Sequence, residues 1–391
     1  MKRKALWISI IGILLIGFVC LFCYRHYIRQ KQIEQKKHTG LVSENFPVQD
    51  IKHQCKNIYE DAYQTEADNQ LQNMRNNNSY TIEEPLLVWN PYGTNTGSFY
   101  YYGVSKQDSY VVCEVTCNNG SVIKHRLKND SDSGVTKTHE YLITGLAPGL
   151  KNHFSLAFYD AGNNLIHTYQ YTVTLKKDKQ IPAITKVEKG NSKSSLTDGL
   201  FAVLGHDKSK AKNIYYYDNN GICRGKTPLN DYRTDRILTI DGKLVYSYSL
   251  TDIAFVNRLG KVEKTLSLGK YELHHDFMYD EKRNELLCLV NDTDKDTIED
   301  VLISVNIETG KIKKLVDFEK MMKSMRKRSV QRKGGKNTYG GTELDWLHLN
   351  SLDMINDKDA VFSSREESVI IKINNIYENP SIDYLIHSGS L

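Results

Sequence analysis

The segment Asp345-Trp-Leu-His-Leu-Asn-Ser-Leu-Asp353 and the later Ser363-Ser-Arg365 bring a histidine, an asparagine and an arginine close together in the sequence. A short strand-like run separates them, so we expect His348, Asn350 and Arg365 to lie on neighbouring β-strands. Arginine offers a rigid fork of donors, and histidine can carry a proton near neutral pH. The pattern therefore predicts a site for a small tetrahedral oxyanion, such as a sulfuryl or phosphoryl group.

The composition limits the classes of protein that could hold such a site. With 391 residues, 40% hydrophobic and 25% charged, the chain is long enough for two domains with separate cores. Its net charge of +5 is small, and no basic stripe interleaved with aromatic residues appears outside the termini, so nucleic acid is not the expected partner. The basic run from Lys323 to Lys333 is expected to be a solvated loop.

The N-terminus contains a candidate membrane segment. Ala5 to Tyr24 is an apolar run of 20 residues without a formal charge, enough to cross a hydrocarbon core of roughly 30 Å. Bulky residues at Phe18 to Cys23 do not resemble a cleavage site, so we expect residues 1–24 to be a signal anchor. Basic residues are more numerous after the run, which by counting favours a cytoplasmic body. The short basic N-terminus before the run is the commoner form of a signal anchor, so we expect the body of the protein to lie outside the cell membrane.

Residues 25–80 are rich in Gln, Lys, Glu and Asn, and their apolar periodicity is weak. They predict a partly helical stalk. Residues 81–177 change to short alternating apolar runs separated by turn residues, which indicates an immunoglobulin-like β-sandwich. Its expected strands are Leu86–Trp89, Ser98–Tyr102, Tyr110–Val115, Glu140–Ile143, His153–Tyr159 and Thr168–Leu175.

A charged linker, Lys176 to Ser192, leads to a second region, residues 193–391, in which pairs of strands recur. A four-stranded unit recurring every 40 to 50 residues or so is typical of β-propeller blades, and about four are present. The fold class predicted for the whole chain is all-β. The recurring pairs are Leu200–Gly205 with Ile214–Gly221, Lys243–Tyr248 with Ile253–Gly260, Glu285–Val290 with Val301–Gly310, and Ala360–Ser364 with Val369–Ile373.

Other residues that could do chemistry receive no role. The seven cysteines show no disulfide framework and no zinc-like spacing, so no metal is expected. The acidic run Asp292 to Asp300 lacks the glycine and the bidentate glutamate of a calcium loop and is expected to be a solvated hairpin tip. Four histidines are expected to be surface or satisfied core residues: His139, His153, His167 and His206.

From Glu84 to its end, the chain resembles the bacterial arylsulfate sulfotransferases, which carry an immunoglobulin-like N-terminal domain and a six-bladed β-propeller. The sandwich resemblance rests on Pro85–Thr94 and His139–Gly149. The resemblance to active-site motifs rests on Leu273-His-His-Asp276, Asp345–Asn350 and Ser363–Arg365. Glu308-Thr-Gly310 resembles the turn between blades.

The resemblance implies transfer of a sulfuryl group from an aryl sulfate to a phenol without a nucleotide sulfate donor, through a sulfated histidine and with no cofactor. It implies that His348 and one of His274 and His275 line the sulfuryl site, that Arg365 neutralises the sulfuryl oxygens, and that Asn350 adds a hydrogen bond. Adjacent residues of a strand point to opposite faces, so at most one histidine of the pair is expected to face the site. Alignment with His348-Leu-Asn350 favours His274.

In the family the nucleophilic histidine belongs to a Gln-His-Asp type of motif in a later blade, and no residue here matches it before Leu391. The sequence therefore predicts a truncated enzyme, a ring completed by a second chain, or an inactive remnant. Its expected partners are a phenolic donor and acceptor and, through the N-terminal helix, the cell membrane. The alternative function is a noncatalytic binding or scaffold propeller at the cell surface.

Overall fold

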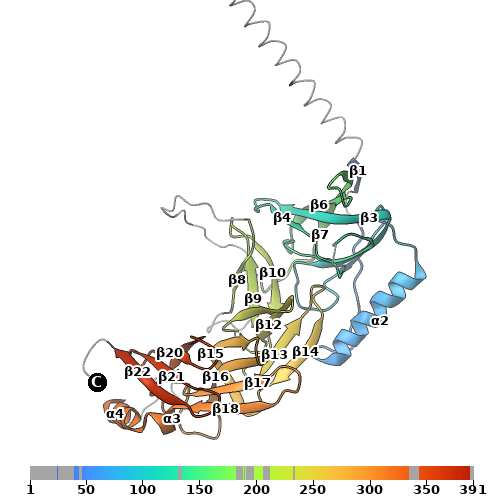
Figure 1. Cartoon of the computed structure of the whole chain (residues 1–391). Coiled ribbons are helices and arrows are strands. Elements are labelled where there is room, and N and C mark those ends of the chain that lie inside the picture. Colours follow the sequence, from blue (N-terminus) through green and yellow to red (C-terminus); the bar gives the residue numbers. More distant parts are fainter. Residues whose placement is uncertain are drawn as a thin grey trace, which may run out of the picture.

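The computed structural model describes residues 24, 39–43, 46–130, 134–181, 188, 190, 198–205, 212–231, 234–333 and 343–387. These residues form mainly antiparallel β-sheets with a few short helices (Figure 1). The predicted anchor lies outside the described residues except for Tyr24. Among the helices that the structure describes, none combines the length and apolar character needed to span a membrane.

The N-terminal region is a seven-stranded sheet that folds into two layers around one core. Its longest strand belongs to both layers: the first half of β3 pairs with β2 and β5, and the second half pairs with β4 and β6. Two runs predicted as separate strands, Ser98–Tyr102 and Tyr110–Val115, are thus parts of one strand. The strands are β1 (Thr39–Ser43), β2 (Leu86–Trp89), β3 (Phe99–Cys117), β4 (Ile123–Arg126), β5 (Thr136–Ile143), β6 (Lys151–Tyr159) and β7 (Leu165–Thr174).

The predicted stalk does not extend away from the body over its last twenty residues. Helix α2 (Asp61–Asn77) buries Gln64, Ala67 and Leu71, and the two apolar ones pack against β2 and β3. Just before the helix, the ring of Tyr59 stacks on Tyr248 at 3.8 Å between ring centroids. The buried face consists of a glutamine, an alanine and a single leucine, which explains why the apolar periodicity is weak.

In the second region, the residues that the structure describes form one three-stranded and three four-stranded antiparallel sheets, each made of strands consecutive in the chain. The four predicted strand pairs fall one in each sheet. The three-stranded sheet contains β8 (Phe201–Val203), β9 (Asn213–Tyr217) and β10 (Cys223–Pro228). The others contain β11 (Ile237–Ile240), β12 (Lys243–Ser247), β13 (Asp252–Val256) and β14 (Val262–Ser267); β15 (Tyr271–Asp280), β16 (Glu285–Asp292), β17 (Val301–Asn306) and β18 (Ile312–Asp317); and β19 (Leu349–Met354), β20 (Ala360–Ser364), β21 (Val369–Asn374) and β22 (Ser381–His387).

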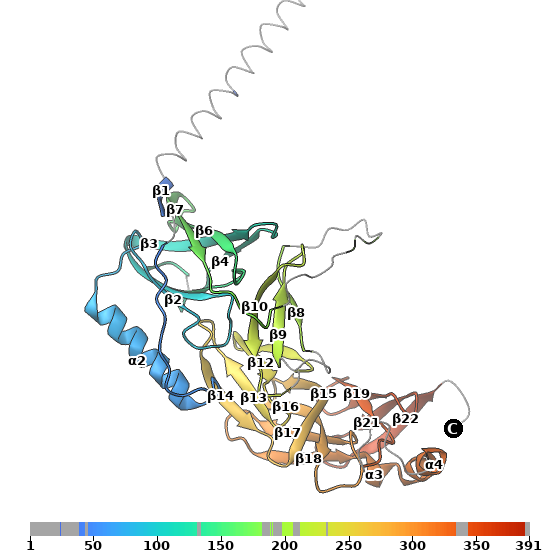
Figure 2. The ribbon, with the colours of Figure 1, turned by 180° about the vertical axis from the view of Figure 1, so that it is seen from behind.

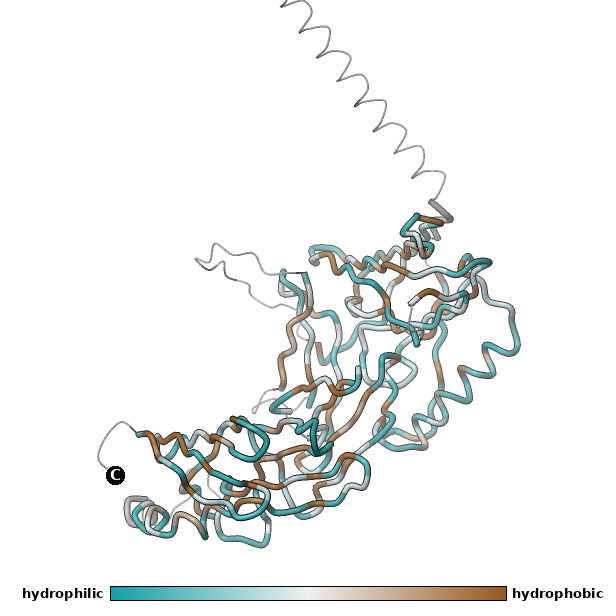
Figure 3. The backbone as a smooth tube through the Cα atoms, in the orientation of Figure 1, coloured by the Kyte–Doolittle hydropathy of each residue, from teal (hydrophilic) through white to brown (hydrophobic). Residues whose placement is uncertain are grey.

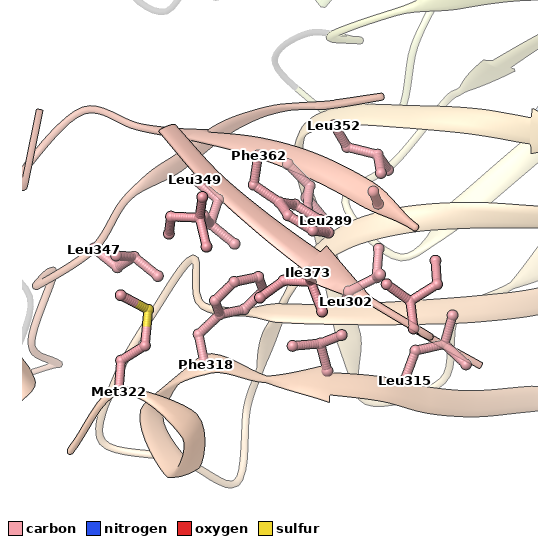
Figure 4. Packing of buried hydrophobic residues seen from close by; sticks show 14 of the residues in the cluster. Leu289, Leu302, Leu315, Phe318, Met322, Leu347, Leu349, Leu352, Phe362 and Ile373 are labelled. Carbon is pink, nitrogen blue, oxygen red and sulfur yellow. The ribbon is translucent and has the colours of Figure 1, made fainter. Parts of the chain in front are cut away.

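These sheets stack face to face, as the two opposite views show (Figures 1 and 2). One apolar cluster joins β11–β14 to β15–β18, and another joins β15–β18 to β19–β22. In the second cluster, Phe362 and Ile373 of the last sheet face Leu289 and Leu302 of the preceding one (Figure 4). Hydrophobic segments accordingly run along the strands, and hydrophilic ones gather at the turns (Figure 3). Burial on both faces of a sheet gives the dense apolar runs seen in β16 and β17, whereas β21 in the last sheet is fully buried on one face only.

Two helices follow β18, where the sequence predicts a solvated loop. Helix α3 (Phe318–Met321) is short, and helix α4 (Lys323–Lys333) carries the basic run. Met322 and Met325 are buried in the same cluster as Phe318, while Lys323 and Lys327 are exposed. The prediction of a loop was wrong because the few apolar residues at helical spacing dock on the sheet and hold the charged segment in a helix.

A buried arginine joins the sandwich to the second region. Arg224 of β10 is fully buried, pairs with Asp218 at 2.7 Å and donates to the carbonyl oxygen of Gly145 in the sandwich at 2.7 Å. The backbones approach so closely here that a Cβ added at Gly97 would lie 1.7 Å from the Arg224 carbonyl oxygen. Breaking such a buried pair on one side typically costs 3–5 kcal/mol or so, which makes the joint a rigid support for the sheets beyond it.

Candidate functional site

Three histidines meet where the first strands of two consecutive sheets, β15 and β19, lie side by side. The rings of His274 and His275 are 3.9 Å apart between centroids, and each lies about 5 Å from the ring of His348. The expectation that only one histidine of the pair faces the site was therefore wrong. The register of β15 shifts between Leu273 and Phe277, and His275 has a φ of 55°, so the alternation of faces is interrupted.

His348 lies immediately before β19 and is almost completely buried. Its Nδ1 is 2.9 Å from Asp345 Oδ2 and also contacts the Glu299 carboxylate, while its Nε2 is 3.0 Å from His275 Nε2. Burial alone would lower the pKa of His348, but the hydrogen bonds and negative charges of Asp345 and Glu299 outweigh it and raise that pKa above the ordinary value. The ring is thus set up to be an imidazolium.

Arg365 follows β20 in a tight turn that is tied to the His348 segment. Its backbone N–H donates to the His348 carbonyl oxygen at 3.0 Å, and its Nη2 lies 3.2 Å from Asp345 Oδ2. The same carboxylate oxygen therefore accepts from both the His348 ring and the Arg365 guanidinium. On the more exposed side, Glu366 accepts from Arg365 at 2.8 and 3.0 Å. The structure therefore brings His348 and Arg365 together at the Asp345 carboxylate.

Asn350 is not brought into this cluster. It is exposed on β19, between Leu349 and Ser351, where the register with β20 shifts by one residue. Among the hydrogen bonds of the described residues, none joins its amide to the histidines or to Arg365. Its predicted hydrogen bond to a substrate oxygen stays a prediction.

The cluster also contains a carboxylate from a segment that the sequence assigned to a solvated hairpin tip. Asp294 and Asp296, in the turn between β16 and β17, are exposed as predicted, but Asp292, Glu299 and Asp300 are buried, so the interpretation was wrong for the two ends of the acidic run. Glu299 Oε2 lies 2.8 Å from His274 Nε2 and contacts His348 Nδ1. Burial would raise the pKa of Glu299, but hydrogen bonds and charge from His274 and His348 lower it to about 2.

The acidic segment folds inward because it pairs with the residues that precede β19. Leu349 N–H donates to the Glu299 carbonyl oxygen at 3.1 Å, and Ile298 N–H donates to Leu344 at 3.2 Å. The fully buried Trp346 adds an indole hydrogen bond to Asp300 at 2.8 Å. The acidic composition of the run does not indicate this backbone pairing with the segment before β19. The sequence indicated a carboxylate near His348 only through Asp345, the first residue of the predicted motif.

The last residue of the His-His-Asp motif fixes the two strands to each other. Asp276 accepts from the backbone N–H of Leu352 on β19 at 3.0 Å and from Arg236 at 2.5 Å. It does not contact the other site side chains through these bonds, and its role is to hold β15 beside β19. The hydrogen bond from Leu352 to Asp276 thus fixes the position of β19 along β15, relative to His274 and His275.

Three residues of the cluster adopt the left-handed backbone conformation that L-amino acids rarely occupy. The φ angles are 55° for His275, 61° for Glu299 and 51° for His348. Such conformations cost roughly 1–3 kcal/mol each in sparsely populated regions and persist where surrounding contacts impose them. Three strained residues in one contact network are typical of a functional site, because the strained backbone holds their side chains in fixed directions.

Two overlapping groups have donor atoms close enough to surround a metal ion. The ligand-type atoms of His274, His275 and His348 lie within 4.8 Å of one another, and so do those of Glu299, Asp345 and His348. The sequence expected no metal because no regular ligand spacing exists. In the structure the same atoms are arranged as imidazole–carboxylate contacts, in which the carboxylates of Glu299 and Asp345 lie on one side of His348 and His275 lies on the other.

Comparisons with known proteins relate this sequence to one family. A comparison with curated proteins found no match. Among solved structures, the β-propeller domain of Cps50 (Swd1) from Myceliophteria thermophila is similar at 8% identity and a TM-score of 0.29, over 63% of this chain and 68% of that one. A model of the arylsulfotransferase (ASST) family matches residues 185–390, which include every residue of the cluster. The chain therefore belongs to the arylsulfotransferase family.

Proposed function

We propose that this protein transfers a sulfuryl group from an aryl sulfate to a phenolic acceptor without a nucleotide sulfate donor. Membership of the arylsulfotransferase family supports sulfotransferase chemistry in general. The observation that carries the finer proposal is the convergence of the His348 ring and the Arg365 guanidinium on Asp345. These two cationic groups suit a monoanionic sulfate ester.

The reaction follows from the charges of these two groups. As a histidine nitrogen bonds to sulfur, the bond between sulfur and the donor oxygen breaks, and negative charge grows on that oxygen and on the sulfuryl oxygens. The His348 imidazolium gives its proton to the departing phenolate, and Arg365 stabilises the sulfuryl oxygens. The acceptor phenol then loses its proton to the neutral imidazole as its oxygen bonds to sulfur and the bond between sulfur and the histidine nitrogen breaks. Positioned proton transfer is typically worth ~10²- to 10⁴-fold in rate, and fixed charges at the developing anion add a comparable factor.

The covalent route implied by the family requires a histidine nucleophile, and our proposal assigns that role to no particular residue. His274, His275 and His348 are the histidines of the described cluster. Mass spectrometry after exposure to an aryl sulfate would identify a sulfated histidine by its mass gain.

The architectural part of the proposal is an immunoglobulin-like sandwich followed by part of a β-propeller. A two-layered sheet that shares β3 supports the first, and four consecutive antiparallel sheets that stack face to face support the second. A second chain completing the ring belongs to this proposal. So does a single-pass anchor at residues 1–24 with the catalytic region outside the cell membrane, which protease accessibility on intact cells would test.

The alternative is a noncatalytic binding or scaffold protein at the cell surface. One observation favours it: Glu366 holds the Arg365 guanidinium from the exposed side through two hydrogen bonds. A guanidinium engaged in this way is partly neutralised, as expected where no anion has to be bound. Catalysis requires that an arriving sulfate ester displace Glu366.

Incubation with a chromogenic aryl sulfate and excess phenol separates the two functions. We expect chromophore release by the wild-type protein and a loss of 10²-fold or more in kcat/KM, by the magnitudes above, in His348→Ala and Arg365→Ala. His153→Ala is the matched control, because that exposed histidine of β6 lies in the sandwich. No release at high protein concentration, or equal release by all four proteins, would contradict the proposed function.

A further inference from the structure

Glu299 is a carboxylate that no motif indicates, and it lies between two of the site histidines. Its side chain is 93% buried, and one oxygen, Oε2, reaches both His274 Nε2 at 2.8 Å and His348 Nδ1. The two rings come from different sheets, since His274 belongs to β15 and His348 precedes β19. A single carboxylate therefore links imidazoles supplied by two separate elements.

The position of Glu299 is determined by backbone contacts on both sides. Its N–H donates to the Asn291 side chain at 2.8 Å, and its carbonyl oxygen accepts from Leu349 at 3.1 Å. Its left-handed φ of 61° turns the side chain toward the histidines instead of along the loop. The contacts fix this conformation, so the carboxylate is aimed before any ligand arrives.

The charged and titratable groups around His348 come from four elements. Asp345 and Glu299 face Nδ1, and His275 faces Nε2, with His274 beside it on the same strand. Arg365 in the turn after β20 contacts Asp345, and Glu366 contacts Arg365. Asp345 and Glu299 thus lie on the Nδ1 side of the ring, while Nε2 points to His275.

We propose that Glu299 is a positioning residue whose carboxylate holds the His348 and His274 rings in their observed orientations, so that His348 Nε2 meets His275 Nε2 and the rings together form the side of the site that receives an anionic ligand. This role rests on the proposed function only for the identity of the anion, a sulfuryl group. A carboxylate behind a histidine sets both its ring orientation and its basicity. The low pKa of Glu299, about 2, keeps that carboxylate ionised throughout the neutral range.

The test uses the full chain with Glu299→Gln, which keeps the size of the side chain and removes its charge. Glu299→Asp keeps the charge, and Glu263→Gln is the matched control because Glu263 pairs with Lys243 in another sheet. The first readout is the titration of His348 followed by NMR of the ring protons and assigned by its loss in His348→Gln. We expect it to move to lower pH by about one unit in Glu299→Gln, to move partway in Glu299→Asp, and to stay unchanged in Glu263→Gln.

The second readout is binding of inorganic sulfate measured by calorimetry at neutral pH. We expect binding about tenfold weaker in Glu299→Gln, partly restored in Glu299→Asp, because a one-unit change in His348 titration leaves less imidazolium. Sulfate binding requires no turnover. A wild-type protein that binds sulfate in this way but transfers no sulfuryl group would refute the proposed function and support the role of Glu299.

Two results would overturn the role of Glu299. One is an unchanged titration of His348 in folded Glu299→Gln. The other is stoichiometric Co²⁺ binding by the wild-type protein, with the visible absorption of a tetrahedral site, that is lost in Glu299→Gln, since the carboxylate would then serve a cation. If Glu299→Gln does not fold, the wild-type protein still has to show His348 titrating above the ordinary histidine value, and Glu299→Asp still has to lower it.

Discussion

Two buried histidines, one in each region of the molecule, have opposite electrostatic surroundings. In the sandwich, the hydrogen-bond partners of the His139 ring are neutral hydroxyl groups: Ser105 at 3.1 Å, Ser109 at 3.2 Å and Tyr141 at 3.1 Å. Burial lowers the pKa of His139 to about 4, against a small opposing effect of Asp108. In the sheets beyond, carboxylates raise the pKa of His348.

The difference shows that the partners of a buried histidine, and not its burial, decide whether it can do acid chemistry. Hydroxyl groups can satisfy either neutral tautomer of His139 without stabilising a charge, so that residue packs like a polar core side chain. Two carboxylates around His348 stabilise a proton on its ring, which the proposed sulfuryl transfer requires. His139 and His348 are buried to a similar degree, so their different partners account for the opposite directions of their pKa shifts.

The largest expected effect comes from removing one of those carboxylates. Asp345→Asn takes the charge from between His348 and Arg365, and we expect kcat/KM for an aryl sulfate to fall by about 10²-fold. The activity of the wild-type protein should decline as pH rises through the raised pKa of His348, because the imidazolium is the active form. In Asp345→Asn that decline should begin at lower pH.

Asp383→Asn is a suitable comparison, because Asp383 forms a partly exposed pair with Lys372 at 2.6 Å on the last sheet. Its activity and pH profile should match the wild type. If Asp345→Asn lowers the activity at every pH but leaves the pH dependence unchanged, the carboxylate only places Arg365. The different surroundings of His139 and His348 would then not explain the activity.

The second effect is on stability and has a defined sign. The folded pKa of His139, about 4, lies below the ordinary value of 6.5, so folding favours the neutral ring. Stability from this group is present above pH 6.5 and is lost as pH falls toward 4. Between pH 6.5 and 5 the loss is about 2 kcal/mol at 1.36 kcal/mol per unit. Urea unfolding of the wild type and His139→Gln should show a flatter pH dependence in the variant.

His167→Gln is the control for that measurement, since His167 on β7 is less buried and lies in the same region. Parallel pH dependences of the wild type and His139→Gln would show that the His139 ring is already charged or hydrated in the folded state. The sandwich histidine would then no longer differ in kind from His348.

The sequence predicted the all-β class, the strand pairs of four sheets and the convergence of His348 with Arg365, because those features follow from alternation, turn residues and a local motif. It failed where tertiary contacts override local pattern. A strand bulge and a left-handed His275 put both histidines of the pair on one side. No two-residue periodicity can indicate such an interruption.

Glu299 and α4 both show that a local sequence pattern does not indicate contacts with distant parts of the chain. Glu299 lies in a run that reads as solvent-exposed, yet backbone pairing with the segment before β19 buries it. Helix α4 reads as a charged loop, yet Met322 just before it and Met325 within it dock on the apolar cluster. In both cases the decisive partner lies elsewhere in the chain, so propensity and charge cannot report it.

The smallest expected effect concerns Asn350, the predicted site residue that lies apart from the cluster. Asn350→Ala should change the free energy of unfolding by under ~0.5 kcal/mol, because the side chain is exposed at a bulge. If its amide donates to a bound sulfate ester, kcat/KM should still fall by roughly tenfold, the value of one hydrogen bond to a charged group. Ser351→Ala, at the adjacent exposed position, should leave activity unchanged. Equal activity of Asn350→Ala and the wild type would restrict the site to the histidines, the carboxylates behind them and Arg365, and catalysis would depend entirely on the charged surroundings that distinguish His348 from His139.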